Sequence, residues 1–416
     1  MGLFDKFKKP KEPPRQQRSG VMELIFCPAE SLAHIMGRME SALGVHSPGT
    51  GNRISIYQDD MHIDFTGFVA DKETEDGKKA QEQLQGVWAY FRQVETEHID
   101  IQRNLLYHLR QCRGMVSVNA VYDGPQNADK EGAISERMGV VTAALQGVLT
   151  WGMDALVDPA GKIILSKDGK SDLEYYMPSE VPIPADWAKD APPEAVERRN
   201  KSMALLRDRH IYVTPWLPLL WERAEEPGRT VEEVCRRAAA LLIVSLYSEC
   251  RVGEHMSYEE SREFVNPIIE SYGAEESFFS PEEWTYLNDP NSTEQTQIQY
   301  AWQYENLWVM EWALGLTDDL FWPTRICDVP QSVRIMRDYP SMEELTAAAR
   351  LRPRKELLDQ ADLIYRLHWA CVDARVMGMP APQELEEGVV MERHRALFWL
   401  AGCDEMCPWD DVDLST

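Results

Sequence analysis

The chain has 416 residues, of which 69 are acidic and 43 are basic, so its formal net charge is −26. This excess of negative charge disfavours approach to nucleic-acid phosphates and anionic lipids, and we expect no nucleic-acid partner. No apolar run reaches the roughly 20 residues that a membrane-spanning helix needs, so we expect a soluble, cytoplasmic protein of two or three domains with no stable membrane insertion.

Residues 1–20 predict a disordered basic tail. Leu3, Phe4 and Phe7 recur at helical spacing among lysines, and a proline-rich stretch follows. The segment is too short for a secretory signal and has the wrong order of charged and apolar residues. Two interpretations stay open: a tail without structure, or a short amphipathic helix that touches a membrane or a partner.

Residues 21–177 alternate strand and helix patterns and predict an α+β domain. A first set of one strand, one helix and two strands lies at residues 22–28, 29–43, 53–60 and 62–69. The same order recurs at residues 114–122, 138–149, 151–158 and 162–169. Two amphipathic helices, at residues 78–94 and 98–112, lie between the sets. The recurrence indicates a duplicated β-α-β-β unit around one sheet.

Eight cysteines are scattered singly along the chain, as is typical of buried free thiols in a reducing compartment. Cys403 and Cys407 form the nearest pair, but no second Cys/His pair with zinc-like spacing accompanies them. His98 and His108 are almost three helical turns apart, too far for one ion. We therefore expect no metal and no cofactor.

Five prolines between residues 178 and 193 predict a linker. Residues 194–416 then predict a mainly α-helical domain. Thr230 with Glu233, and Ser280 with Glu283, have the spacing of a capping box at the start of a helix. Residues 300–316 are nearly apolar all round and predict the central helix of the bundle. The last two helices are expected at residues 354–375 and 384–400, separated by a Gly/Pro-rich stop.

Ionisable side chains occur inside these apolar helices, and an ion in a core must be paired. Asp362 and Arg366 are four residues apart, which allows an ion pair on one helix face. A bond from Glu392 to a guanidinium of the preceding helix would lock the last two helices together. In the central helix, Glu305 is placed to accept from an arginine of the last helices, and Glu311 also requires a partner, for which a core salt bridge is expected.

Two interpretations of these groups stay open. The structural one is a buried polar network that ties the helices and consists of Glu305, Asp362, Arg366, Asp373, Glu392, Arg393 and Arg395. The functional one is a pocket lined by candidate catalytic or ligand-binding residues, namely Arg366, His368, Asp373 and Glu392. The sequence has no Walker loop, HExxH helix, paired CxxC or nucleophile with an obvious base, which favours the structural interpretation.

Several ordered blocks of the second half carry a family resemblance. They include Arg229-Thr230, Trp312-Ala313-Leu314-Gly315, Tyr365-Arg366-Leu367-His368-Trp369-Ala370 and Trp409-Asp410-Asp411-Val412. Through them, residues 194–416 resemble the bacterial family called domain of unknown function 4272 (DUF4272), whose longer members similarly carry an α/β region before the helical one. The resemblance implies no activity, cofactor or catalytic residue. Glu311 and Phe398 depart from the family pattern, which weakens the case for a polar reaction centre on their faces.

The expected function is therefore a non-catalytic binding or regulatory module that engages a protein partner, of the toxin-neutralising or effector-associated type. The acidic composition suits a basic partner. The alternative is an enzyme that acts on an anionic small molecule, with a pocket in the C-terminal helical domain. A purely structural oligomer subunit, which would leave a large apolar face open, is a third interpretation.

Overall fold

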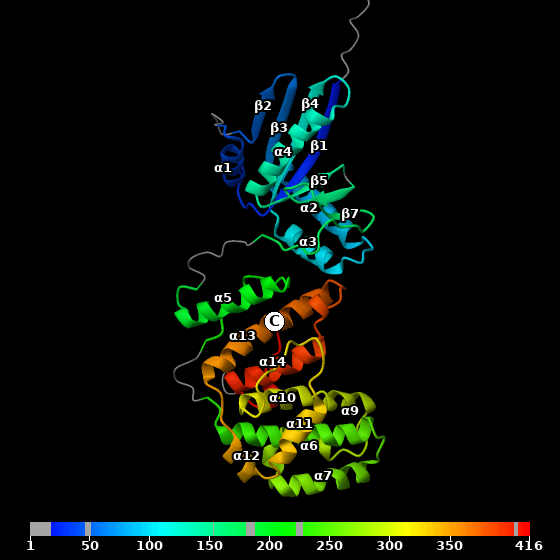
Figure 1. Ribbon diagram of the computed structural model, residues 1–416, viewed down its shortest axis with the longest axis vertical. Helices are drawn as coiled ribbons and strands as arrows, with labels where there is room; N and C mark the ends of the chain where they lie inside the picture. Colours follow the sequence, from blue (N-terminus) through cyan, green and yellow to red (C-terminus); the bar gives the residue numbers. More distant parts are fainter. Residues whose placement is uncertain (1–17, 46–50, 153, 180–187, 222–227, 403–406) are drawn as a thin grey trace, which may run out of the picture. The chain divides into compact units, whose positions relative to one another are not determined.

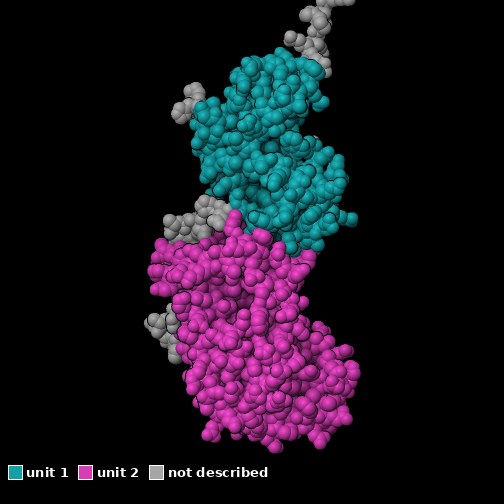
Figure 2. Space-filling model, in the orientation of Figure 1, with its two compact units in different colours: residues 1–181 teal, residues 182–416 magenta. Residues whose placement is uncertain are grey.

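The computed structural model describes residues 18–45, 51–152, 154–179, 188–221, 228–402 and 407–416. The chain divides into two compact units, residues 1–181 and 182–416 (Figure 2). The first unit is built on an antiparallel sheet with helices, and the second is mainly helical. The predicted fold class, an α+β domain followed by a helical domain, is confirmed.

Among the described residues of the first unit, seven strands form one antiparallel sheet in the order β2-β3-β4-β1-β5-β6-β7 (Figure 1). The strands are β1 (Arg18–Cys27), β2 (Arg53–Gln58), β3 (Met61–Val69), β4 (Gly114–Asp123), β5 (Val148–Trp151), β6 (Ala155–Val157) and β7 (Ile163–Ser166). Alternate residues of β3, such as Ile63 and Phe65, are buried, because successive side chains of a strand point to opposite faces. One face of the sheet therefore carries the core.

Helices α1 (Leu32–Leu43) and α4 (Ala128–Ala144) cover that face, and their apolar side chains share one core with the strands. Ser31 caps α1, and Gly44 ends it in the left-handed conformation (φ 64°). Helices α2 (Glu75–Arg92) and α3 (Ile99–Gln111) pack against each other; α2 contacts β3 and β4, and α3 contacts β1 and β7.

The predicted recurrence is present in the element orders β1-α1-β2-β3 and β4-α4-β5-β6-β7, but the second set has an additional strand. The strands expected at residues 151–158 and 162–169 correspond to β6 and β7, and β5 begins within the expected helix. The hairpins β2–β3 and β5–β6 also join the central β1–β4 pair differently. In the first hairpin the second strand, β3, pairs with β4, whereas in the second hairpin the first strand, β5, pairs with β1. The repeat is thus one of element order and not of strand pairing.

Two predicted boundaries in this unit are wrong. Strand β1 begins at Arg18, within the predicted tail, because Arg18 continues the ladder opposite Asp123 and its side chain pairs with that carboxylate at 3.1 Å. Helix α4 begins ten residues earlier than expected, because the side chain of Asn127 caps it. It also ends earlier, at Ala144, since the chain reverses at Gln146 (φ 53°) before β5. Residues 1–17, with the expected amphipathic segment, lie outside the described residues.

The described helices of the second unit are α5 (Pro193–Asp208), α6 (Val231–Val252), α7 (Tyr258–Tyr272), α8 (Pro281–Leu287), α9 (Glu294–Ala301), α10 (Tyr304–Ala313), α11 (Val329–Asp338), α12 (Met342–Ala348), α13 (Arg354–Val376) and α14 (Glu387–Ala401). Both predicted capping boxes, Thr230 with Glu233 and Ser280 with Glu283, are present. Every residue of α10 is buried, and α10 packs against α6, α11 and α14. It is the central helix that the apolar pattern predicts.

The predicted central helix is nevertheless broken. Helix α9 ends at Ala301 and α10 begins at Tyr304, because Trp302 and Gln303 form a tight turn in which the Gln303 N–H donates to the Tyr300 carbonyl at 3.2 Å. The last helix likewise starts at Glu387 and not at residue 384, since Gln383 and Glu384 have positive φ angles. Among the described residues, no helix is both long and apolar enough to cross a membrane.

Of the expected linker, residues 180–187 lie outside the described residues. The helical unit begins with α5, in which Pro193 is the first helical residue and Pro192 the N-cap. Proline is tolerated at that position because the first N–H groups of a helix have no partner inside it.

Candidate functional site

Arg366 and Asp362 form an ion pair within α13, and both side chains are fully buried. The guanidinium donates from Nε and Nη2 to the two oxygens of Asp362, at 2.9 and 2.7 Å. This bidentate geometry neutralises the charge of Arg366 one turn away on its own helix. The prediction that Glu392 bonds to an arginine of the preceding helix is therefore wrong where that arginine is Arg366, which pairs with Asp362.

Glu305 of α10 and Arg393 of α14 form a second buried ion pair, with Arg393 Nε 3.0 Å from Glu305 Oε2 and exposures of 2% and 3%. Glu305 thus accepts from an arginine of the last helices, as its position in the sequence indicates. Arg393 Nη1 also donates to the carbonyls of Leu320 and Phe321, and Glu305 accepts from the Cys327 N–H. The pair therefore fixes the loop between α10 and α11.

Glu392 is buried beside this pair. Its Oε2 accepts from Asn306 Nδ2 at 2.7 Å and lies 3.7 Å from Arg395 Nε on the same helix. Burial raises the pKa of Glu392 above its usual value, and Arg395 and Asn306 counteract that rise. Asp373, the remaining predicted member, is partly buried near the C-terminal end of α13.

His368 contacts a residue that the sequence pattern does not single out, His394 of α14. Their Nδ1 atoms lie 2.8 Å apart, so one ring donates and the other accepts. Burial lowers the pKa of His368 to about 4 and holds that of His394 well below its usual range. Both rings are therefore neutral at pH 7, and His394 packs edge-on against Phe398 at a centroid distance of 4.0 Å.

Glu311 has no cationic partner among the described residues, contrary to the expected core salt bridge. Ser332 Oγ donates to Glu311 Oε1 at 2.9 Å. Burial raises the pKa of Glu311 to about 9, so the side chain is an uncharged carboxylic acid at pH 7. The helix avoids the cost of an unpaired buried charge by keeping the proton.

Three of the four predicted catalytic candidates, Arg366, His368 and Glu392, thus meet partners in the interior. The surface pockets along α6, α7 and α11 are lined by none of the four. This placement supports the structural interpretation of Arg366, His368 and Glu392. His108, in the first unit, is also buried, between the Tyr176 hydroxyl and the Gln146 carbonyl. No group of three His, Cys, Asp or Glu side chains suited to a metal ion occurs among the described residues.

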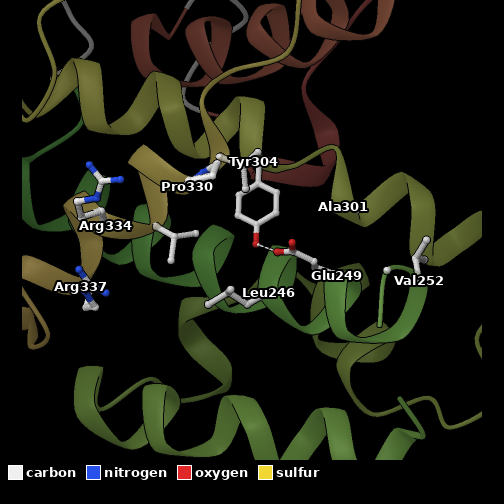
Figure 3. A pocket seen from close by; sticks show the side chains of 11 residues that line it. Leu246, Glu249, Val252, Ala301, Tyr304, Pro330, Arg334 and Arg337 are labelled. Atoms are coloured by element: carbon white, nitrogen blue, oxygen red, sulfur yellow. Dashed lines mark hydrogen bonds between the residues drawn. The ribbon is translucent and has the colours of Figure 1, made fainter. Parts of the chain in front are cut away.

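A surface pocket of about 690 Å³ lies between α6, the α9–α10 break and α11 (Figure 3). Its lining residues are Leu246, Glu249, Val252, Gly253, Ala301, Tyr304, Val329, Pro330, Val333, Arg334 and Arg337. Ala301 and Tyr304 flank the turn that breaks the predicted central helix. The pocket therefore lies at the break between α9 and α10, which the apolar pattern of the sequence does not predict.

Polar groups occur at two places in this pocket. The Tyr304 hydroxyl donates to Glu249 Oε2 at 2.6 Å, and burial together with this carboxylate raises the pKa of Tyr304 well above its usual range. Arg334 and Arg337 are exposed, and no carboxylate of the described residues pairs with them. In Figure 3 the arginines lie on one side and Glu249 on the other, with Leu246 and the Tyr304 ring between. The spacing of three between the arginines on an amphipathic helix is the sequence signal that marks this site.

A second exposed surface lies on the sheet face opposite α1 and α4. Met22 and Tyr57 are both 74% exposed there. Tyr57 stacks on His62 with a centroid distance of 4.3 Å, and Asp64 accepts from Ser55 and lies 3.0 Å from His62 Nε2. Cross-strand neighbours thus hold an exposed aromatic ring in one orientation.

The fold and these contacts define a two-unit protein in which an antiparallel α+β unit precedes a helical unit with a buried polar core. The sequence profile of the family described as domain of unknown function (DUF4272) matches residues 198–412, just over half of the chain. The chain belongs to this family, in agreement with the resemblance. No curated protein and no solved structure matches the chain.

Proposed function

We propose that the chain is a non-catalytic binding module that engages a protein partner, in the manner of a toxin-neutralising or effector-associated protein. The observation that carries this proposal is that three of the predicted reactive groups, Arg366, His368 and Glu392, are buried and bonded to other side chains of the core. A catalytic acid, base or anion-binding group must reach its substrate. Arg366 and His394 are 0% exposed and His368 is 5% exposed, and each is bonded to a neighbouring side chain.

The exposed sheet face of the first unit supplies a surface for such a partner. Methionine and aromatic residues are enriched in protein interfaces, and here Met22 and Tyr57 project from a rigid sheet. The net charge of −26 makes a basic partner the best electrostatic match and accelerates its association. A cytoplasmic location belongs to the same proposal, because the cysteines of the described residues are free thiols.

A capture experiment with the full chain as bait tests the proposal. We expect a basic protein from the native host to be retained at low ionic strength and released as salt is added, since salt screens charges at an interface rim. Tyr57→Ser should weaken capture, whereas Tyr90→Ser, which changes an exposed tyrosine of α2, should leave it unchanged. Capture that neither salt nor Tyr57→Ser weakens would contradict the proposal.

A variant of the buried core distinguishes the binding module from the competing enzyme interpretation. A double variant, Asp362→Leu with Arg366→Met, removes the proposed anion-binding group and replaces the ion pair by apolar side chains. A binding module that acts through the sheet face keeps its partner in this variant. Loss of capture in a folded double variant would count against the sheet face as the docking surface.

A further inference from the structure

We infer that the pocket between α6, α10 and α11 binds a short apolar peptide with free ends, that is, a molecule with a cationic group and an anionic group separated by an apolar body. The pocket lies on the helical unit, and the inference is independent of the protein partner proposed above. It rests on the size, the apolar lining and the opposed polar groups of the pocket.

The centre of the pocket is apolar. Leu246 and Val252 contribute from α6, and Val329 and Val333 contribute from α11, with the ring of Tyr304 beside them. The volume of about 690 Å³ falls within the roughly 300–1,000 Å³ typical of small-molecule sites. Such a lining gains free energy by removing the apolar part of a ligand from water.

The anionic end of the ligand is assigned to Arg334 and Arg337. The two side chains are one helical turn apart on α11 and reach the same end of the pocket (Figure 3). The chain has 69 acidic residues, yet none of those described pairs with either arginine. Two guanidinium groups beside an apolar surface provide the planar donors that a carboxylate accepts best.

The cationic end is assigned to Glu249. Its Oε2 is held by the Tyr304 hydroxyl at 2.6 Å, while Oε1 accepts no hydrogen bond from the described residues. The Tyr304 phenol stays protonated, so its hydroxyl is a permanent hydrogen-bond donor that orients the Glu249 carboxylate. An ammonium group of a ligand would complete the remaining acceptor sites of Glu249.

The separation of the two charged places selects the class of ligand. In Figure 3 Leu246 and the Tyr304 ring lie between Glu249 and the arginines. A single amino acid carries both charges on one carbon, and a zwitterionic lipid carries them together in its headgroup. A short peptide with free ends places apolar side chains between an amine and a carboxylate, which is the order that the pocket presents.

Calorimetric titration of the full chain with leucyl-leucine, its N-acetylated form and its C-terminal amide tests the inference. We expect saturable binding of the free dipeptide and a loss of about tenfold in affinity for each blocked form, because each lacks one charge-assisted hydrogen bond. No saturable binding of the free dipeptide, or equal affinity for all three forms, would overturn the inference.

Variants assign the two ends of the ligand. Arg334→Gln should weaken the free dipeptide by about tenfold but leave the amide unaffected, and Glu249→Gln should weaken the free dipeptide but not the acetylated form. Arg325→Gln, which changes charge equally in the exposed loop before α11, should bind as the parent protein does. Thermal melting confirms that each variant is folded. The assignment would be refuted if Arg334→Gln weakened the amide as much as the free dipeptide, or if Glu249→Gln weakened the acetylated form as much.

Discussion

The free energy of burying Arg366 depends on Asp362, because both side chains have lost contact with water. Arg366→Met leaves the Asp362 carboxylate buried and unpaired, and we expect it to lower the free energy of unfolding by about 3–5 kcal/mol. The double variant with Asp362→Leu should recover most of this loss. Urea unfolding of the two single variants and the double variant measures the coupling.

An exposed pair of the same spacing provides the control. Arg236 and Glu232 on α6 are 48% and 62% exposed and form a salt bridge four residues apart. Arg236→Met should cost far less stability, since water screens an exposed pair. Equal losses for Arg236→Met and Arg366→Met would contradict the role assigned to the buried pair.

Glu311 makes stability depend on pH in a defined direction. Its pKa is raised from 4.5 to about 9, so between these values the unfolded chain has released a proton that the folded chain keeps. This contribution to stability is fully present below the lower value and is lost as pH rises towards the upper one. Glu311→Gln should remove the dependence.

We therefore expect the stability of Glu311→Gln to rise relative to the parent protein by up to about 1.4 kcal/mol per pH unit within that window. Urea unfolding near the two ends of the window gives the slope. Glu249→Gln, which changes an exposed carboxylate, serves as the control. A constant difference between Glu311→Gln and the parent protein would show that Glu311 is ionised in the folded state.

At the scale of elements, the contact between His368 and His394 joins α13 to α14 through two neutral rings. The pKa of His368 is lowered to about 4, so between pH 6.5 and about 4 the unfolded chain binds a proton that the folded chain excludes. Stability is therefore lost as pH falls through this range. Ring-nitrogen NMR shifts should show neither ring titrating near its ordinary pKa, and a midpoint near 6.5 would contradict the buried pair.

Two arginines hold the loop between α10 and α11: Arg352 donates to the carbonyls of Thr317 and Asp318, and Arg393 of α14 binds the loop further along. Arg393 holds the carbonyls of Leu320 and Phe321, and Phe321 has a positive φ of 53°, which costs a non-glycine residue conformational energy. We expect Arg393→Gln to speed amide hydrogen exchange in the loop and to lower stability by about 3–5 kcal/mol. Arg395→Gln on the same helix should leave loop exchange unchanged. Unchanged slow exchange in Arg393→Gln would mean that other contacts, such as those of Arg352, are sufficient to hold the loop.

Local patterns predict the contacts that close within one or two turns. The spacing of Asp362 and Arg366 gives their pair, and the capping boxes give the starts of α6 and α8. Contacts between helices are harder to predict, because periodicity shows on which face of its helix a residue lies but not which other helix packs against that face. Glu392 and His394 therefore found partners that the sequence does not indicate.

The break at Trp302 and Gln303 was missed for a related reason. Neither residue is glycine or proline, and the apolar pattern runs through the turn without change. Helices α9 and α10 both pack on α6. We infer that this packing sets the position of the break and overrides the local preference of these residues for a continuous helix. The pocket at that break lay outside the predicted candidates for the same reason.

At the scale of the whole molecule, the helical unit has its own apolar core, made of residues from α5 to the C-terminal segment. A unit with its own core is expected to fold alone. A fragment of residues 188–416 should therefore show helical circular dichroism and a single cooperative thermal transition. A fragment that lacks such a transition would show that the helical unit requires the sheet unit for stability.

The strand order of the sheet also bears on how the protein behaves at high concentration. It places β2 and β7 at the two ends of the sheet, where a strand with a neighbour on one side only can recruit a second molecule into a growing fibril. At β7, both backbone groups of Ile163 are already bonded to Asp172. Both strands are short, and Asp59 and Asp60 follow β2 directly. The short edge strands, the aspartates after β2 and the electrostatic repulsion between negatively charged copies together oppose edge-to-edge association.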